Sequence, residues 1–165
     1  MFRPTMLGAL AALAMGAVSA AAQDGVFTVR HMTPETAQKA ADAALKACRA
    51  SGYQVAVAIV DRSGILQTLI RDRFAGPHTV TIATDKAWTA VTLRQDTLEL
   101  ARLSESGEMS GLRQFPRIVA VGGGLMVEAG GSIVGGIGVS GAPGGPADAR
   151  CAQAGIDAIV DELTF

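Results

Sequence analysis

The stretch AVAIVDRSGILQTLIRDRFAGPHT, residues 56–79, decides the fold of this 165-residue chain. Residues 55–60 are apolar on both alternating faces, which is typical of a strand that is covered on both sides. The turn residues Asp-Arg-Ser-Gly follow at 61–64 and residues 65–71 return as a second strand, so the segment predicts a β-hairpin. A Gly-Pro-His corner then leads into a predicted helix over residues 79–94. The corner places His78 where a loop meets a helix start, which is a common place for a ligand-binding group.

A helix is predicted before this hairpin. Thr33-Pro34-Glu35 is a favourable helix start, because threonine caps well, proline suits the first position and an acid stabilises the helix dipole. Alanine, leucine and cysteine recur at helical spacing after it, and Gly52 ends the helix.

More elements are predicted after residue 94. Residues 96–99 have the spacing of a capping box and start a helix that ends at Gly107. A short apolar run at 118–121 precedes two strands, 125–128 and 132–139, which a glycine-rich turn joins, and a last helix closes the chain. Hairpins dominate this order, so the sequence predicts an α+β layered domain with an antiparallel five-stranded sheet and helices packed on it.

Composition limits the class of protein. Hydrophobic residues make up 49% of the chain, enough for the core of one domain. The 14 basic and 15 acidic residues nearly balance, so nothing indicates a nucleic-acid partner.

Residues 1–22 are predicted to be a signal peptide. Arg3 precedes the apolar run 6–18, which is shorter than the ~20 residues that span a bilayer, and Ala20-Ala21-Ala22 provides a cleavage pattern. The alternative is a buried N-terminal helix, which the absence of a polar face disfavours. We therefore expect a mature domain of residues 23–165 that is periplasmic or secreted and has no membrane span.

The two cysteines, Cys48 and Cys151, lie on the apolar stripes of the first and last predicted helices. An even number of cysteines in an exported protein suggests a disulfide, although two buried thiols would give the same pattern. A disulfide would stabilise the fold by roughly 4–5 kcal/mol in the chain-entropy model. The sequence leaves both alternatives open.

Three polar residues are candidate ligand groups. Haem without covalent attachment needs an axial ligand such as imidazole, so His78 and His31 are candidate metal ligands; the alternative for each is an ordinary surface or capping histidine. Lys86 is a candidate for binding an anionic group such as a carboxylate or a haem propionate, or else a surface lysine with a partly covered stem.

Four segments carry a family resemblance: VAIVDRSG at 57–64, KAWTA at 86–90, GGGLMV at 122–127 and VGGIGVSG at 134–141. In order and spacing, the chain resembles the GlcG/HbpS-like proteins over roughly residues 33–163. This family includes the C-terminal domain of PduO-type cobalamin adenosyltransferases.

The resemblance implies a profilin-like fold, assembly into homo-oligomers, often octamers, and non-covalent binding of haem or a related tetrapyrrole. It also implies that an N-terminal histidine ligates haem in some members, which corresponds to His31 here. Together with His78, Lys86, Gly123 and Gly124, this histidine makes up the expected cofactor-binding set.

The function expected from this resemblance is haem binding with a sensing or haem-handling role, and a protein partner would fit that role. Two alternatives stay open: an enzyme or redox accessory that acts on a small organic acid, and an oligomeric interaction scaffold without a cofactor. Whether the protein is an enzyme is left undecided.

Overall fold

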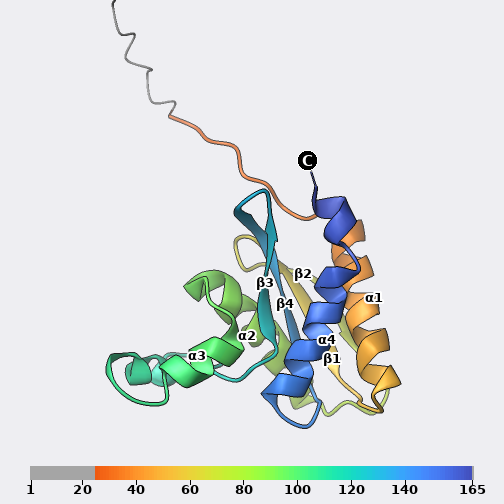
Figure 1. The fold of residues 1–165 in the computed structure, drawn as a ribbon, viewed down its shortest axis with the longest axis vertical. Helices are drawn as coiled ribbons and strands as arrows, with labels where there is room; N and C mark the ends of the chain where they lie inside the picture. The colour runs from red at the N-terminus through yellow and green to blue at the C-terminus, as the bar shows by residue number, and fades with distance from the viewer. Residues whose placement is uncertain (1–24, 165) are drawn as a thin grey trace, which may run out of the picture.

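The computed structural model describes residues 25–164 and forms one antiparallel sheet with helices packed on both faces (Figure 1). Within these residues the sheet has four strands, β1 (Ala56–Asp61), β2 (Leu66–Arg71), β3 (Gly124–Ala129) and β4 (Ser132–Ser140), in the order β2-β1-β4-β3. Both predicted hairpins are present, and their inner strands β1 and β4 pair in the middle of the sheet. The predicted α+β class is confirmed. The predicted signal peptide lies outside the described residues.

The prediction of five strands is wrong, because residues 118–121 do not join the sheet. The backbone there is held by a side chain of the neighbouring helix. The Val119 amide donates to the Thr89 hydroxyl oxygen at 3.1 Å, and the same hydroxyl donates to the Arg117 carbonyl at 3.1 Å. The likeness to profilin stays a prediction.

Helices cover both faces of the sheet (Figure 1). On one face, α1 (Pro34–Ala50) lies beside α4 (Gly145–Asp157), and the Cys48–Cys151 disulfide joins them. On the other face lies α2 (His78–Leu93), which is followed by the short α3 (Thr97–Leu103). The two cysteines, for which the sequence left a disulfide and two buried thiols open, therefore form a disulfide.

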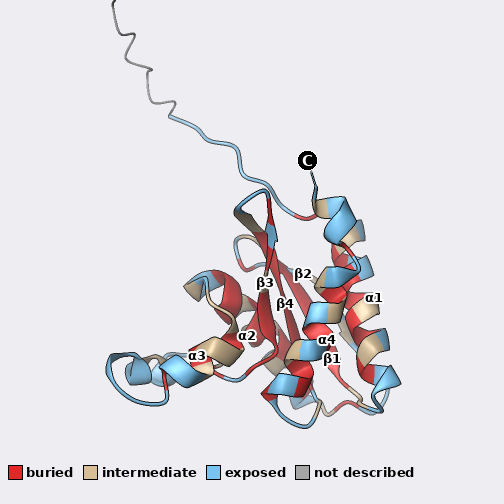
Figure 2. Ribbon diagram, viewed as in Figure 1, coloured by how far each residue is buried: buried red, intermediate tan, exposed pale blue. Residues whose placement is uncertain are grey.

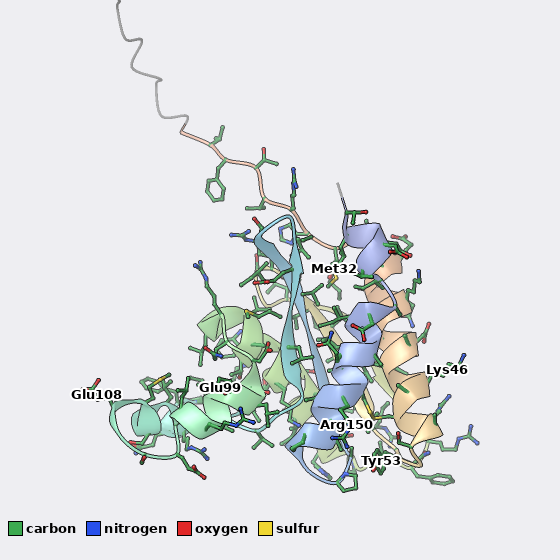
Figure 3. The ribbon with its side chains drawn as sticks, viewed as in Figure 1. Met32, Lys46, Tyr53, Glu99, Glu108 and Arg150 are labelled. Atoms are coloured by element: carbon green, nitrogen blue, oxygen red, sulfur yellow. A yellow bond between two sulfur atoms is a disulfide. The ribbon has the colours of Figure 1, made fainter. Side chains whose placement is uncertain are left out.

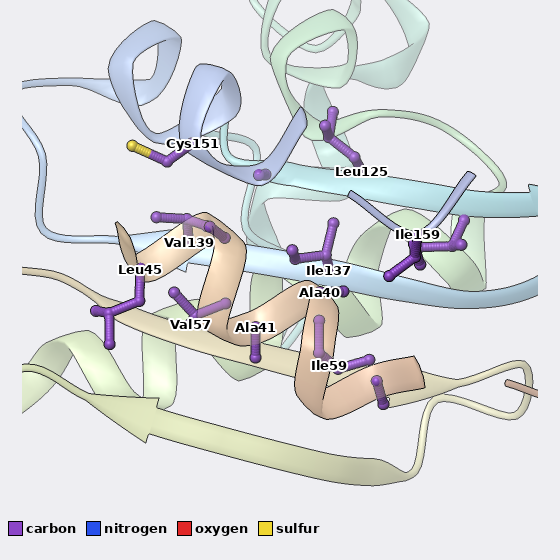
Figure 4. Close-up of a cluster of buried hydrophobic side chains, with 14 of the residues drawn as sticks. Ala40, Ala41, Leu45, Val57, Ile59, Leu125, Ile137, Val139, Cys151 and Ile159 are labelled. Atoms are coloured by element: carbon purple, nitrogen blue, oxygen red, sulfur yellow. The ribbon is translucent and has the colours of Figure 1, made fainter. Parts of the chain in front are cut away.

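The α1/α4 side holds the main hydrophobic core. Aliphatic side chains of the sheet meet the small residues of α1 and α4 there, as Figure 4 shows, and the inner surfaces of these elements are buried in Figure 2. The buried residues that Figure 4 labels are Ala40, Ala41, Leu45, Val57, Ile59, Leu125, Ile137, Val139, Cys151 and Ile159.

The α2 side is packed through backbone rather than through large side chains. A Cβ added at Gly138 of β4 would collide with the carbonyl of Ala83 in α2, and one at Gly136 would lie 2.6 Å from the Val91 side chain. Glycine at these two positions lets the helix rest directly on the central strand. This close contact fixes where the residues of α2 lie relative to the sheet.

The predicted start of the first helix agrees with the structure, whereas the predicted cap and end of the helix after residue 96 do not. Thr33 caps α1, since its hydroxyl accepts from the Thr36 amide at 3.2 Å. Asp96 precedes α3 without capping it, because its carboxylate accepts instead from the Met126 amide of β3 at 3.2 Å. The predicted helix also stops at Leu103 rather than at Gly107.

Two 3₁₀ segments complete the fold, η1 (Glu108–Gln114) and η2 (Val160–Leu163). Figure 3 shows Glu99 and Glu108 on the α3–η1 part, which projects away from the sheet. Among the helices within residues 25–164, none combines the length and the hydropathy that crossing a membrane requires.

Candidate functional site

His31 lies immediately before α1 and faces the turn of the first hairpin. Its Nδ1 is 3.6 Å from Oδ2 of Asp61, the last residue of β1. The other oxygen of Asp61 accepts from the amides of Ser63 at 2.8 Å and Ile65 at 2.9 Å, so the turn holds the carboxylate in place. This distance is longer than a hydrogen bond, but it places the carboxylate on the Nδ1 side of the ring and leaves the Nε2 side to face a ligand. The His31 side chain is 35% exposed, so a ligand has access to it.

A pocket of about 420 Å³ opens beside His31. This volume falls within the ~300–1,000 Å³ typical of small-molecule sites. Figure 3 shows Met32 where the chain that precedes α1 meets the β3–β4 hairpin, and the Met32 amide donates to the Val134 carbonyl at 3.3 Å. The wall is mixed, with apolar and charged members: Val29, Arg30, His31, Met32, Val134 and Glu162.

The rim of this pocket is organised by Glu162 of η2. Its carboxylate accepts from Lys39 at 2.5 Å and from the Thr36 hydroxyl at 3.1 Å. These two hydrogen bonds lower the pKa of Glu162. They also tie the C-terminal segment to α1, so both ends of the described chain meet at the pocket beside His31.

His78 is the first residue of α2 and is exposed. Its ring lies against Gly76, where an added Cβ would come within 2.6 Å of the imidazole Cε1. Within residues 25–164 its side chain makes no hydrogen bond or ion pair, which fits the surface alternative at least as well as a ligand role.

The two histidines lie at opposite ends of β1. The loop that leads to His78 is tied to the start of this strand, since the Asp72 amide donates to the Val55 carbonyl at 2.9 Å, whereas His31 faces Asp61 at its end. A strand of six residues separates its two ends by about 17 Å. The histidines of one chain therefore cannot ligate the same metal ion.

Lys86 is buried, so the alternative of a surface lysine is wrong. Its Nζ donates to Oδ2 of Asp148 in α4 at 2.7 Å and to the Val139 carbonyl of β4 at 3.0 Å. The other Asp148 oxygen accepts from the Ala142 amide at 2.9 Å. Burial lowers the pKa of Lys86 and raises the pKa of Asp148, while the ion pair opposes both shifts. This pair connects α2 to α4 across the end of the sheet.

Gly123 and Gly124 lie against this ion pair. A Cβ on Gly123, whose φ is +118°, would be 2.6 Å from the Asp148 Cβ and 3.0 Å from the Lys86 Nζ. A Cβ on Gly124 would collide with the Lys86 carbonyl. The glycines thus let β3 begin close to the buried pair, and a contact of Lys86, Gly123 or Gly124 with a cofactor stays a prediction.

The described part of the chain holds no cluster of three or more histidine, cysteine, aspartate or glutamate side chains suited to a bare metal ion. The His31–Asp61 pair offers one ligating nitrogen beside a partly apolar pocket. Such a site suits a metal that arrives already held by an organic ring and needs an axial ligand. The sequence singles out His31, whereas Asp61 carries no specific signal beyond its place in the turn before Ile65.

Comparison with known proteins adds an independent result. Residues 32–157 match the family model described as "Haem degrading protein HbpS-like". No curated protein is similar enough in sequence to count as a match.

Several solved structures resemble this fold. The crystal structure of a double mutant of Streptomyces reticuli HbpS is 39% identical, with a TM-score of 0.77 over 86% of this chain and 97% of that one. Klebsiella pneumoniae protein ORFY is 29% identical, with a TM-score of 0.81 over 84% of this chain and 97% of that one. PduOC, solved as a haem complex, is 27% identical, with a TM-score of 0.72 over 78% of this chain and 95% of that one.

Proposed function

This chain belongs to the HbpS-like family, and we propose that it binds haem non-covalently with His31 as the axial ligand of the iron. The observation that carries the proposal is the placement of His31 between the fixed carboxylate of Asp61 and a pocket of about 420 Å³. The solved haem complex of the similar protein PduOC supports haem as the ligand.

The residues around His31 fit such a ligand. Val29, Met32 and Val134 offer apolar surface for a porphyrin face, and Arg30 adds positive charge at the rim, which suits propionate carboxylates. The Asp61 carboxylate, on the Nδ1 side of the His31 ring, favours the ring orientation that leaves the other nitrogen free for the iron. When bound, haem supplies an iron centre with redox and gas-binding chemistry, while the protein supplies the axial ligand, the apolar surface and the orientation.

His31 is preferred to His78 because only His31 combines a carboxylate partner with a pocket. His78 provides a matched control, since the same change at an exposed histidine should leave haem binding intact. Hemin titrated into the wild type should give a saturable Soret band. H31A should lose or shift this band, and H78A should retain it. A wild-type spectrum in H31A, or only free-hemin behaviour in the wild type, would refute the proposal.

We also propose that the protein acts after export and as a homo-oligomer, with a sensing or haem-handling role. A disulfide is typical of oxidising compartments, which supports export. The edge strand β2 and its turn expose Ile65, Leu66 and Leu69, which supports association through this side of the sheet. Light scattering on the purified protein would test assembly, since a monomeric mass at micromolar concentration argues against it.

A further inference from the structure

We propose that a second pocket, separate from the proposed haem site, binds a small zwitterion, namely an α-amino acid with an apolar side chain. The pocket has a volume of about 430 Å³ and lies between the end of α2 and the β3–β4 hairpin. Met126 and Glu128 of β3 line it, whereas Ala129, the next residue along, lines the His31 pocket. Because neighbouring strand residues point to opposite faces, the two pockets lie on opposite sides of this hairpin.

Charged groups with unused hydrogen-bonding capacity share this pocket. Arg94 and Glu128 make no side-chain hydrogen bond or ion pair with any described residue. Arg62 makes a single long contact, from Nη1 to the Ile133 carbonyl at 3.4 Å. None of the three is ion-paired with another, although opposite charges line one cavity. The pocket thus offers two guanidinium groups as donors and one carboxylate as an acceptor.

The backbone at Arg94 is the second observation. Arg94 ends α2 in the left-handed region, with φ 52° and ψ 46°, where glycine is the usual residue. Its amide still donates to the Ala90 carbonyl, so the helix end is held in the ordinary way. An arginine where glycine would be less strained indicates that its side chain has a use at this position.

An amino acid offers a partner to all three charged groups of the pocket at once. Its carboxylate can accept from Arg94 and Arg62 in the forked geometry that guanidinium favours. Its ammonium can pair with Glu128 near the carboxyl end of α2, which carries partial negative charge. An apolar side chain can rest on Val91 and Ile133. A simple carboxylate would leave Glu128 unpaired, so a zwitterion is preferred to an anion.

Calorimetric titration of the full chain with L-leucine tests the proposal. Leucine should bind saturably, whereas isocaproate, which lacks the amine, and isoamylamine, which lacks the carboxylate, should each bind at least about tenfold more weakly. Absence of binding by leucine and by L-methionine, or equal affinity for leucine and isocaproate, would overturn the proposal.

The variant R94G separates the ligand role of Arg94 from its place in the fold. Glycine suits the left-handed backbone, so thermal stability should be equal or higher while leucine affinity falls at least about tenfold. E128Q should weaken leucine binding but not isocaproate binding. R150Q, at an exposed arginine that does not line the pocket, should bind leucine like the wild type. Wild-type affinity in R94G would refute the assignment, and H31A should retain leucine binding whether or not it binds haem.

Discussion

Replacing Lys86 by methionine should lower the free energy of unfolding at pH 7 by about 3–5 kcal/mol, the usual effect of removing one partner of a buried ion pair. Methionine preserves most of the apolar stem, so the loss comes from the polar contacts. Asp148 loses a donor at 2.7 Å and the Val139 carbonyl loses one at 3.0 Å. The Asp148 carboxylate would then be buried with only backbone amides as donors, including that of Ala142 at 2.9 Å.

The cost of this change should depend on pH in a defined direction. Burial already raises the pKa of Asp148 above its ordinary value of 3.8, and Lys86 opposes that rise. Without Lys86 the folded carboxyl binds a proton more tightly than the unfolded one. The variant therefore loses stability as pH rises above about 4, and its deficit against the wild type is smallest in acid and largest near neutrality.

Urea unfolding of the wild type, K86M and the double variant K86M/D148L, at pH 4.5 and pH 7, measures this effect. The double variant leaves no unpaired charge and should unfold within about 1 kcal/mol of the wild type or be more stable. A deficit for K86M that stays below about 1 kcal/mol at pH 7, or that grows in acid, would refute the reasoning. Hemin titration of folded K86M also tests the predicted cofactor contact, since weaker hemin binding than in the wild type would support Lys86 as a propionate-binding group.

The Cys48–Cys151 disulfide closes a loop of 103 residues, so reducing it should lower the free energy of unfolding by about 4–5 kcal/mol. Urea titrations with and without reductant would measure this loss, and an unchanged midpoint would contradict the chain-entropy account. Gly138→Ala should yield no soluble protein because its Cβ would collide with a carbonyl of α2, whereas Gly111→Ala, where the new methyl meets nothing, should purify normally. Hydrogen bonding by an arginine lowers the pKa of buried Asp72 from 3.8 to about 2, so its contribution to stability is complete above pH 4 and is lost as pH falls toward 2. In thermal scans, the stability of D72N should fall less between pH 4 and pH 2 than that of the wild type. An acid profile identical to that of the wild type would argue against this role of Asp72.

The sequence predicted best what is decided by neighbouring residues. The turn at 61–64 and the Thr33-Pro34 helix start depend on local chemistry, and both are present in the structure. The failures concern groups that meet only in the folded chain. Val119 is apolar like a strand residue, but its amide bonds to Thr89, and Asp96 has the spacing of a cap, but its carboxylate serves β3.

In the candidate site, too, single residues could be predicted from the sequence, but their partners could not. His31 could be identified from its position before a helix, but its partner Asp61 is brought to it by the hairpin. For Lys86 the sequence predicts either an anion-binding group or a surface lysine, because its internal partner, Asp148, lies 62 residues further on. The left-handed backbone of Arg94 had no signal at all, since helix ends of this kind are expected to carry glycine.

The most direct test of the proposed haem site is the absorption spectrum of the hemin complex of H31A, recorded before and after addition of free imidazole. His31 as the axial ligand predicts that H31A loses the wild-type Soret band and that imidazole restores it, because the small molecule replaces the missing side chain beside Asp61. A wild-type band in H31A without imidazole would contradict this account and assign the iron to another residue.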